Sequence, residues 1–454
     1  MTAAVSDYHS WFSRRALSMP PNPFGQLVPL MRDPEMKVLC QGVPPDSCFP
    51  LLSMTCKLHD GSEVVLSEAD TRLAQRYPPF ACGPLREWLL RHVQQLHSPP
   101  LAEWDITIAA GSMSSVDLVC AMLVDPGDVV LIEEYSFLAG IDALRSYGAQ
   151  LHPLPVDAEG LRPDALERAC TELAQRGLRP KMLYTVPVGQ NPTGTSMTSQ
   201  RYAQIYDIAC RFNILIVEDD AYFYQQHVQR GAGCSDSSTS AAGSPATSRE
   251  EMPLPGMSLG PSFLSLDSDG RVLRLDSFSK TLAPGFRLGW ATGAKPLIDR
   301  YNMLAYASSQ NGCSLSMMLL GKMLEAWGDA GFEAHLRKLQ SALRSRCDAL
   351  VAAAEAHLGP AALGPGAAAS WQRPQAGMFL WCRLANRQKT TEELVALMRQ
   401  HGVAVMPGEF CSAAGSEDGK QCPYLRLSFV ASEGEYPEAM RRLGGLMQSL
   451  GGET

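Results

Sequence analysis

Two serines, a lysine and an arginine lie close together in the sequence, between two apolar runs. Ser277, Ser279 and Lys280 follow the apolar run 272–275, and Arg287 comes seven residues after the lysine, behind a Pro-Gly turn. Hydroxyl and guanidinium groups bind phosphate, and a lysine amine can react with a carbonyl to form a Schiff base. The cluster therefore predicts a site where an amine meets a carbonyl beside a phosphate. The alternative is a strand end with ordinary solvated polar residues.

Two further groups suited to a phosphorylated ring follow apolar runs earlier in the chain. The Gly/Ser turn 109–114 follows the run 106–108 and opens a helical pattern, so its backbone N–H groups and the Ser112 hydroxyl suit an anion. Phe137 follows the run 129–132 and offers a flat face for stacking against a heterocycle. An ordinary turn and a core phenylalanine are the alternatives for these two positions.

Polar groups also follow the apolar runs 182–186 and 214–217. Asn191, in a Pro-flanked turn, is suited to donate an amide hydrogen to a ring oxygen. Asp219 is the middle one of three consecutive acids, which repel one another unless one faces a cation such as a protonated ring nitrogen. Tyr222 follows three residues later as a hydroxyl donor. The alternatives are a plain turn at the asparagine and a helix cap or magnesium site at the acids.

All of these groups are expected at the carboxyl ends of strands. From about 105 to 293, short apolar runs alternate with amphipathic stretches, which predicts a mostly parallel α/β sheet covered by helices on both faces. Ligands of such sheets bind at the carboxyl ends of the strands. A phosphate cradle, a stacking ring, an amide donor, a carboxylate and an amine are what pyridoxal phosphate requires of a protein. The strands are expected at 106–108, 129–132, 182–186, 214–217, 272–275 and 290–292.

The remaining segments predict how the chain is divided. Residues 1–50 are broken by Pro and Gly and predict an N-terminal arm that lies over another part of the protein. Residues 51–311 are expected to form a large cofactor-binding domain, with a Ser/Gly/Ala-rich surface insertion at 230–260. Residues 312–454 predict a smaller α+β domain, because helical patterns precede apolar, strand-like runs. The helical patterns cover 317–327 and 332–358.

Composition is typical of a soluble enzyme. Of the 454 residues 45% are hydrophobic and 19% charged, and the net charge of −8 disfavours nucleic-acid or membrane-surface binding. No apolar run approaches the roughly 20 residues that span a bilayer, and no secretory signal is expected. The thirteen cysteines show no metal-ligand spacing and are expected to be mostly reduced thiols. We expect no metal and a cytoplasmic location, with the mitochondrial matrix as an alternative.

In combination, several motifs resemble those of fold-type I pyridoxal-phosphate aminotransferases, in the subgroup of kynurenine/2-aminoadipate and aromatic-amino-acid aminotransferases. The resemblance extends from about Gly42 to the C-terminus, apart from the insertion. It implies a large domain with a mostly parallel seven-stranded sheet between helices, plus a smaller α+β C-terminal domain. The most specific motifs are Leu-Tyr-Thr-Val-Pro at 183–187, Asn-Pro-Thr-Gly at 191–194, the segment 267–280, Gly-Met-Phe-Leu-Trp at 377–381 and Tyr-Leu-Arg at 424–426.

The resemblance also implies a role for each candidate residue of the cofactor site. Lys280 forms the Schiff base with the cofactor, Asp219 pairs with the ring nitrogen, and Phe137 stacks on the ring. Asn191 and Tyr222 bind the phenolic oxygen, and Lys280, Asp219 and Tyr222 form the catalytic set. The phosphate is bound by Ser112, the Met113 backbone N–H, Ser277, Ser279 and Arg287.

For the substrate, the resemblance implies that Arg426 binds the α-carboxylate in two-point fashion. Gly42 and Asn191 line the substrate site, and Tyr77 reaches it from the second subunit of a homodimer. The amino-acid and oxo-acid substrates therefore meet residues from two chains.

Three positions depart from the family pattern. Met113 stands where the family often has glutamine, so only its backbone can bind phosphate. Phe137 replaces the usual stacking tyrosine and lacks its hydroxyl. Gly25 occupies the place of a substrate-recognising arginine of the 2-aminoadipate enzymes, which weakens the case for that donor.

The expected activity is transamination from an L-amino acid of aromatic, kynurenine or 2-aminoadipate type to 2-oxoglutarate, by a ping-pong mechanism. One alternative is a pyridoxal-phosphate lyase or decarboxylase, which would keep every cofactor residue. A non-catalytic regulator on the same fold is the other, and it would carry a DNA-binding region before the large domain. Only about 50 broken, non-basic residues precede that domain, which disfavours the regulator.

Overall fold

The computed structural model describes most of the chain. Its larger described segments are 7–20, 33–40, 42–78, 82–226, 259–364, 369–385, 389–415, 422–431 and 433–450. Gly25 and residues 230–258 of the expected insertion lie outside the described residues.

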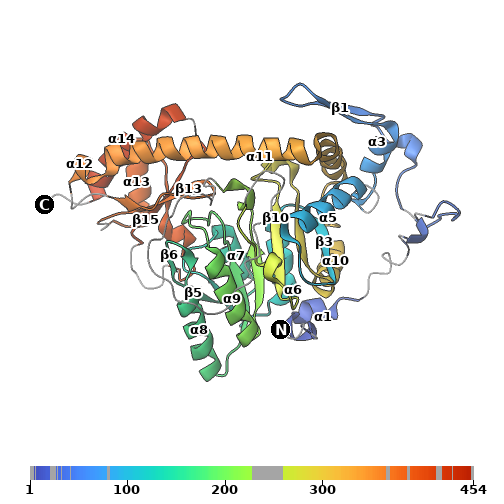
Figure 1. Cartoon of the computed structure of the whole chain (residues 1–454), viewed down its shortest axis with the longest axis horizontal. Helices are drawn as coiled ribbons and strands as arrows, with labels where there is room; N and C mark the ends of the chain where they lie inside the picture. The colour runs from blue at the N-terminus through green and yellow to red at the C-terminus, as the bar shows by residue number, and fades with distance from the viewer. Residues whose placement is uncertain are drawn as a thin grey trace, which may run out of the picture.

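A seven-stranded sheet forms the centre of the molecule (Figure 1). Its strand order is β3-β11-β10-β9-β8-β4-β5, and every neighbouring pair is parallel except the two that involve β11. The prediction of a mostly parallel α/β sheet is therefore confirmed. The strands are β3 (Trp104–Ala109), β4 (Val129–Glu133), β5 (Gln150–Leu154), β8 (Pro180–Thr185), β9 (Leu215–Asp219), β10 (Val272–Ser277) and β11 (Gly289–Ala294).

Strand β5 is missing from the strands expected from apolar runs. It lies at the edge of the sheet, where it pairs with β4, and most of its side chains are only partly buried. An edge strand needs no continuous apolar run, because one of its sides has no neighbouring strand. Because β5 contains polar residues such as Gln150 and His152, it shows no apolar run that would predict a strand.

Side chains alternate between the two faces of each strand and so divide the core into two layers. On one face, Leu183 and Ile216 pack with α5, α8, α9 and the first part of α11. On the other face, Ile132, Val217 and Leu275 pack with α6, α7 and α10. The helices are α5 (Gly83–His97), α6 (Ser112–Leu123), α7 (Leu138–Ser146), α8 (Pro163–Gln175), α9 (Ser199–Phe212), α10 (Lys295–Ser308) and α11 (Ser314–Leu358).

A second, antiparallel sheet of four strands follows in the C-terminal part of the chain, in the order β12-β13-β15-β14. It shares a core with α13, α14 and the second part of α11. The domain boundaries expected at 51 and 312 stay predictions. The elements are β12 (Ser370–Trp371), β13 (Phe379–Arg383), β14 (Met406–Pro407), β15 (Tyr424–Ser428), α13 (Thr391–His401) and α14 (Tyr436–Leu450).

Helix α11 connects the two sheets and runs along one side of the molecule (Figure 1). It is interrupted at Gly328, whose φ of 58° and ψ of −176° are not helical. The break lies in the gap between the helical patterns at 317–327 and 332–358. A glycine adopts this positive φ without the steric cost that a side chain would bring.

The N-terminal segment has two different parts. Trp11, Phe12 and Ala16 are buried in the core layer that contains α6 and α10, next to helix α1 (Arg14–Ser18). The Ser13 hydroxyl anchors this part by donating to the carbonyl of Ala121 at 2.6 Å. Farther along, the hairpin β1 (Met54–Lys57) and β2 (Glu63–Leu66) and helix α3 (Glu68–Ala74) lie at the opposite end of the molecule from β13 and β15 (Figure 1).

None of the helices in the described part of the chain is long and apolar enough to cross a membrane.

Candidate active site

A cavity of about 220 Å³ lies at the carboxyl ends of the central strands. Its wall consists of side chains that end or follow strands of the large sheet, together with two from the smaller sheet. Most of the residues that the sequence predicted for the cofactor line this cavity. The lining residues are Ser112, Phe137, Val186, Asn191, Asp219, Ala221, Tyr222, Lys280, Phe379 and Arg426.

Asp219 is the last residue of β9 and is 5% exposed. One carboxylate oxygen, Oδ2, accepts a hydrogen bond of 2.6 Å from the Tyr184 hydroxyl. The other oxygen, Oδ1, is buried without a hydrogen-bond partner among the described residues. Burial raises the pKa of Asp219 to about 6, and the bond from Tyr184 opposes that rise. The free oxygen therefore fits a cationic N–H group, which would satisfy its hydrogen-bonding capacity and favour its charged form.

Asn191 connects the two sheets at the cavity. Its Oδ1 accepts a hydrogen bond of 2.7 Å from the Arg426 guanidinium, and its amide nitrogen lies 3.5 Å from the Tyr222 hydroxyl. Arg426 also lies over the ring of Phe379, with 4.2 Å between the guanidinium carbon and the ring centroid. Burial raises the pKa of Tyr222, so its hydroxyl stays protonated and can donate.

A close backbone approach brings the two halves of this site together. Gly189 and Gly377 both have positive φ, 52° and 76°, and a Cβ added at Gly189 would lie 2.5 Å from the backbone nitrogen of Gly377. A Cβ at Gly194 would likewise lie 2.5 Å from the carbonyl oxygen of Phe379. Glycines are needed here because any side chain would push apart the turns that carry Asn191 and Phe379.

Lys280 follows β10 and lines the cavity within reach of cationic neighbours. Burial, followed by the positive charges of Arg426 and Arg287, lowers its pKa. A lowered pKa increases the fraction of neutral amine, which is the form that attacks a carbonyl or accepts a proton. Its backbone carbonyl is held by the side-chain amide of Gln225.

The Gly/Ser turn before α6 lies against Arg287. A Cβ at Gly111, whose φ is 87°, would come within 2.6 Å of the guanidinium, so the absence of a side chain admits Arg287 to this place. The guanidinium also lies 3.5 Å from the Ser279 hydroxyl, and the Ser279 N–H donates to the Ser277 hydroxyl oxygen at 3.1 Å. Since α6 begins at Ser112, its N-terminal N–H groups join the same cluster.

This donor set fits pyridoxal phosphate. The unpaired oxygen of Asp219 suits the ring nitrogen, and the amide and hydroxyl of Asn191 and Tyr222 suit the phenolic oxygen. The cluster around Arg287 suits the phosphate, and Lys280 suits the aldehyde. Met113 is partly buried against the core, as expected if only its backbone contributes.

Two of the three consecutive acids, Glu218 and Asp220, have a different partner. Both pair with Arg274 of β10, at 3.1 and 2.9 Å, and Arg274 also pairs with Asp276 at 2.8 Å. All four side chains are buried on the face of the sheet opposite Asp219. No group of three or more potential metal ligands in the described segments could hold a metal ion, so the magnesium alternative has no support there.

Gly42 and Tyr77 do not join the cavity of their own chain. Neither lines it, and Tyr77, which follows α3 in the chain, is 51% exposed. Their expected contribution to a substrate site therefore stays a prediction.

Three cavity residues, and one residue behind the cavity, had no assigned role in the sequence prediction. Val186, Ala221 and Phe379 line the wall, and Tyr184 supports Asp219 from behind. The signal for Tyr184 and Val186 was the two-residue period of strand β8, which places both on the same face. Phe379 lies within the motif 377–381, but its place depends on the smaller sheet.

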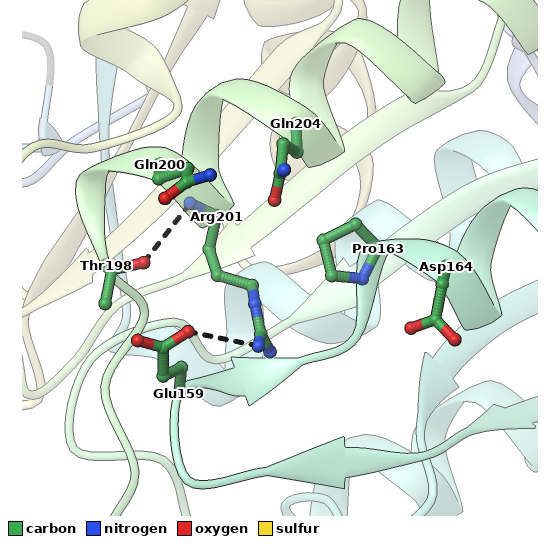
Figure 2. Close-up of a pocket in the computed structure, with 7 residues that line it drawn as sticks. All are labelled: Glu159, Pro163, Asp164, Thr198, Gln200, Arg201 and Gln204. Atoms are coloured by element: carbon green, nitrogen blue, oxygen red, sulfur yellow. Dashed lines mark hydrogen bonds and ion pairs between the residues drawn. The ribbon is translucent and has the colours of Figure 1, made fainter. Parts of the chain in front are cut away.

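A second hollow, of about 340 Å³, lies where α8 and α9 begin, beside the short hairpin β6 (Val156–Asp157) and β7 (Gly160–Leu161) (Figure 2). Arg201 lies in its wall but is paired with Asp157 at 2.8 Å and Glu159 at 3.1 Å. Its charge is therefore neutralised within the chain. None of the predicted site residues lines this hollow.

Comparison with known proteins supports the same cofactor as the residues of the cavity do. The family model described as aminotransferase class I and II matches residues 38–443. The bovine mitochondrial kynurenine/alpha-aminoadipate aminotransferase is 30% identical over 425 residues, which cover 90% of this chain and 91% of the relative.

Two solved structures are similar over nearly the whole chain. Aminotransferase Aro8 from Candida albicans has a TM-score of 0.82 at 26% identity, covering 99% of both chains. The kynurenine aminotransferase from Pyrococcus horikoshii, solved with PMP, kynurenine and its product, has a TM-score of 0.70 at 25% identity, covering 98% of both. The chain therefore belongs to the class I and II aminotransferases and is a pyridoxal-phosphate-dependent enzyme of fold type I.

Proposed function

We propose that this aminotransferase moves the amino group of an L-amino acid with an aromatic side chain, kynurenine included, to 2-oxoglutarate. The observation that carries the proposal is the placement of Arg426, which is fixed by Asn191 and lies over an aromatic ring at the mouth of a cofactor-sized cavity. A guanidinium binds a carboxylate at two points, and both substrates of transamination carry an α-carboxylate.

Aromatic residues near Arg426 support the choice of donor. Trp381 is paired with Arg426 across β13 and β15, and its ring stacks on that of Tyr424 with centroids 5.0 Å apart. Tyr135 completes the group at 5.3 Å from both rings. Such a group favours a flat apolar side chain over a second carboxylate. Kynurenine appears in the names of the bovine relative and of the Pyrococcus structure.

In this proposal the chain's own residues handle the proton and the charges. The cofactor, when bound, supplies an electron-accepting ring that stabilises negative charge at the substrate Cα. Lys280, with its lowered pKa, removes the proton from the substrate Cα and delivers it to the C4′ carbon of the cofactor. Asp219 keeps a positive charge at the ring nitrogen in a site from which water is largely excluded. Donor and acceptor use the site in turn, which predicts ping-pong kinetics.

We expect glutamate to form from 2-oxoglutarate with phenylalanine, tyrosine, tryptophan or kynurenine as donor, and more slowly with 2-aminoadipate. A coupled glutamate assay over this donor panel measures kcat/KM for each. As a matched variant, Arg426→Lys keeps the charge but loses the two-point geometry, so kcat/KM falls about 10- to 100-fold for every donor alike. Release of carbon dioxide or ammonia without glutamate would favour the decarboxylase or lyase alternative.

We further propose that the enzyme is a homodimer in which Tyr77 completes the partner's site. Several apolar side chains of the N-terminal part are exposed in the single chain. Single exposed apolar residues are common, but so many in one region are unusual. A second copy would cover them and would bring Tyr77 and Gly42 to a cavity that they do not reach in their own chain. The exposed residues are Leu39, Leu52, Val65 and Tyr77, at 97%, 69%, 58% and 51%.

Subunit complementation tests the dimer. Tyr77→Ala and Lys280→Ala chains are each expected to be poorly active alone, but a mixed dimer contains one site with both native residues. After co-expression with random pairing, about a quarter of the wild-type activity returns. Activity that stays at the mean of the two parents would show that Tyr77 acts within its own chain or not at all.

For the compartment we propose the cytoplasm. The mitochondrial matrix is the second candidate, because the bovine relative is named mitochondrial.

A further inference from the structure

Tyr184 is a buried tyrosine of the large sheet whose hydroxyl is hydrogen-bonded to the carboxylate of Asp219. It lies on β8 and is 1% exposed, and its hydroxyl donates to Asp219 Oδ2 at 2.6 Å. Because Asp219 Oδ1 has no partner among the described residues, the two oxygens of this carboxylate have different surroundings. One oxygen is held by the protein and the other is buried without a partner, and the residue itself lines the cavity.

The bond joins two rigid elements. β8 and β9 are neighbouring parallel strands, with Tyr184 opposite Val217, and Asp219 lies two residues farther on the same face. A carboxylate at a strand end can rotate about χ2, and a single short hydrogen bond from a neighbouring strand removes that freedom. Burial keeps the pKa of Tyr184 well above its usual value, so the hydroxyl always acts as donor.

Gly140 provides independent evidence that the place of this hydroxyl matters. It lies in the first turn of α7, where glycine is a poorer helix former than alanine by at most about 1 kcal/mol, and its backbone does not have the positive φ that would require glycine. A Cβ at Gly140 would lie 2.8 Å from the Tyr184 hydroxyl oxygen and 3.1 Å from the ring carbon that bears it. The missing side chain therefore leaves the room that the hydroxyl occupies.

We propose that Tyr184 is a positioning residue for the cofactor: it fixes the plane of the Asp219 carboxylate so that Oδ1 meets the ring nitrogen, and Gly140 provides the space for its hydroxyl. The inference rests on the proposed pairing of Asp219 with that nitrogen. Tyr184 acts through Asp219 and touches neither substrate nor the reacting atoms.

Two readouts that do not depend on turnover test this role. The first is the affinity of the apoenzyme for pyridoxal phosphate, and the second is the ¹⁵N resonance of the labelled ring nitrogen. In Tyr184→Phe we expect about tenfold weaker cofactor binding, as for the loss of a hydrogen bond to a charged group. The ¹⁵N resonance is expected to shift toward the position of an unprotonated pyridine, because the carboxylate stabilises the ring proton less well.

Gly140→Ala should change both readouts in the same direction, because the new methyl group displaces the hydroxyl. Added to Tyr184→Phe, it should have a smaller effect than in the wild-type protein, because the hydroxyl is already gone. Tyr436→Phe is the matched control: this buried tyrosine of the smaller core loses hydrogen bonds to the carbonyls of Phe429 and Ala431, and both readouts should stay unchanged.

The variant Asp219→Asn distinguishes the positioning role of Tyr184 from the proposed pairing of Asp219 with the ring nitrogen. If Asp219→Asn changes both readouts while Tyr184→Phe and Gly140→Ala leave them at wild-type values, the positioning role is wrong and the role of Asp219 stands. If Asp219→Asn also leaves them unchanged, both are wrong. A change in Tyr436→Phe as large as in Tyr184→Phe would also overturn the inference, because it would mark a general loss of stability.

Discussion

We expect that replacing Lys280 with alanine removes transamination and leaves a folded protein. The side chain lines the cavity with a lowered pKa, and in the proposed function its amine both reacts with the cofactor carbonyl and transfers the proton. We expect kcat to fall by about 10⁴-fold or more, since acid–base transfer alone contributes up to about that factor. The coupled glutamate assay measures the loss, and the visible absorption band of the wild-type enzyme with its cofactor should be absent.

Lys295→Ala is the control for this experiment. Lys295 is an exposed lysine at the start of α10, paired with Asp299 at 2.7 Å, and its removal should leave activity unchanged. An active Lys280→Ala enzyme that keeps the visible band would contradict the assignment of the catalytic lysine.

We expect that replacing Arg274 with methionine strongly destabilises the fold. Arg274 is fully buried with Glu218, Asp220 and Asp276, and it is the cation that pairs with all three in the described structure. Its removal leaves buried carboxylates unpaired, which costs about 3–5 kcal/mol in comparable cases. Urea unfolding of the apoprotein measures the change in free energy.

The pH dependence of this loss has a definite sign. Burial already raises the pKa of Asp276 to about 6 and that of Asp220 well above its usual value, and loss of the arginine raises both further. Protonation relieves the repulsion, so the difference between wild type and Arg274→Met should grow as pH rises from 5 to 8. Arg211→Met, which breaks only exposed pairs with Glu167 and Asp207, should cost far less. Equal losses in the two variants would contradict the buried-cluster argument.

The acids at 218–220 show both what the sequence reveals and what it hides. Their position after an apolar run predicted a site, and of the three only Asp219 lines the described cavity, while its pairing with a ring nitrogen stays a prediction. The sequence alone did not show that Glu218 and Asp220 neutralise Arg274, because the arginine is on another strand, 54 residues beyond Asp220. Period-two alternation separates the two faces only when the register of both strands is known.

The N-terminal part was the least predictable. The Pro/Gly-rich composition predicted an arm that lies over another part of the protein, and Trp11 and Phe12 are buried in the core layer that contains α6 and α10. Aromatic residues there were a signal for packing, but not for the surface that receives them. Tyr77 and Gly42 do not line the cavity of their own chain, and their place in the proposed dimer depends on a second copy, which no single-chain pattern describes.

The hydrogen bond between Asn191 and Arg426 links the carboxylate anchor to both sheets at once. Asp219 ends β9 and Lys280 follows β10, both strands of the large sheet, whereas Arg426 lies on β15 of the smaller sheet. If Arg426 binds the substrate carboxylate as proposed, a small rotation of the smaller sheet would move the substrate relative to the cofactor. Substrate preference can consequently be retuned by changes in the core beneath β13 and β15, far from any reacting atom, while the spectrum of the bound cofactor stays the same.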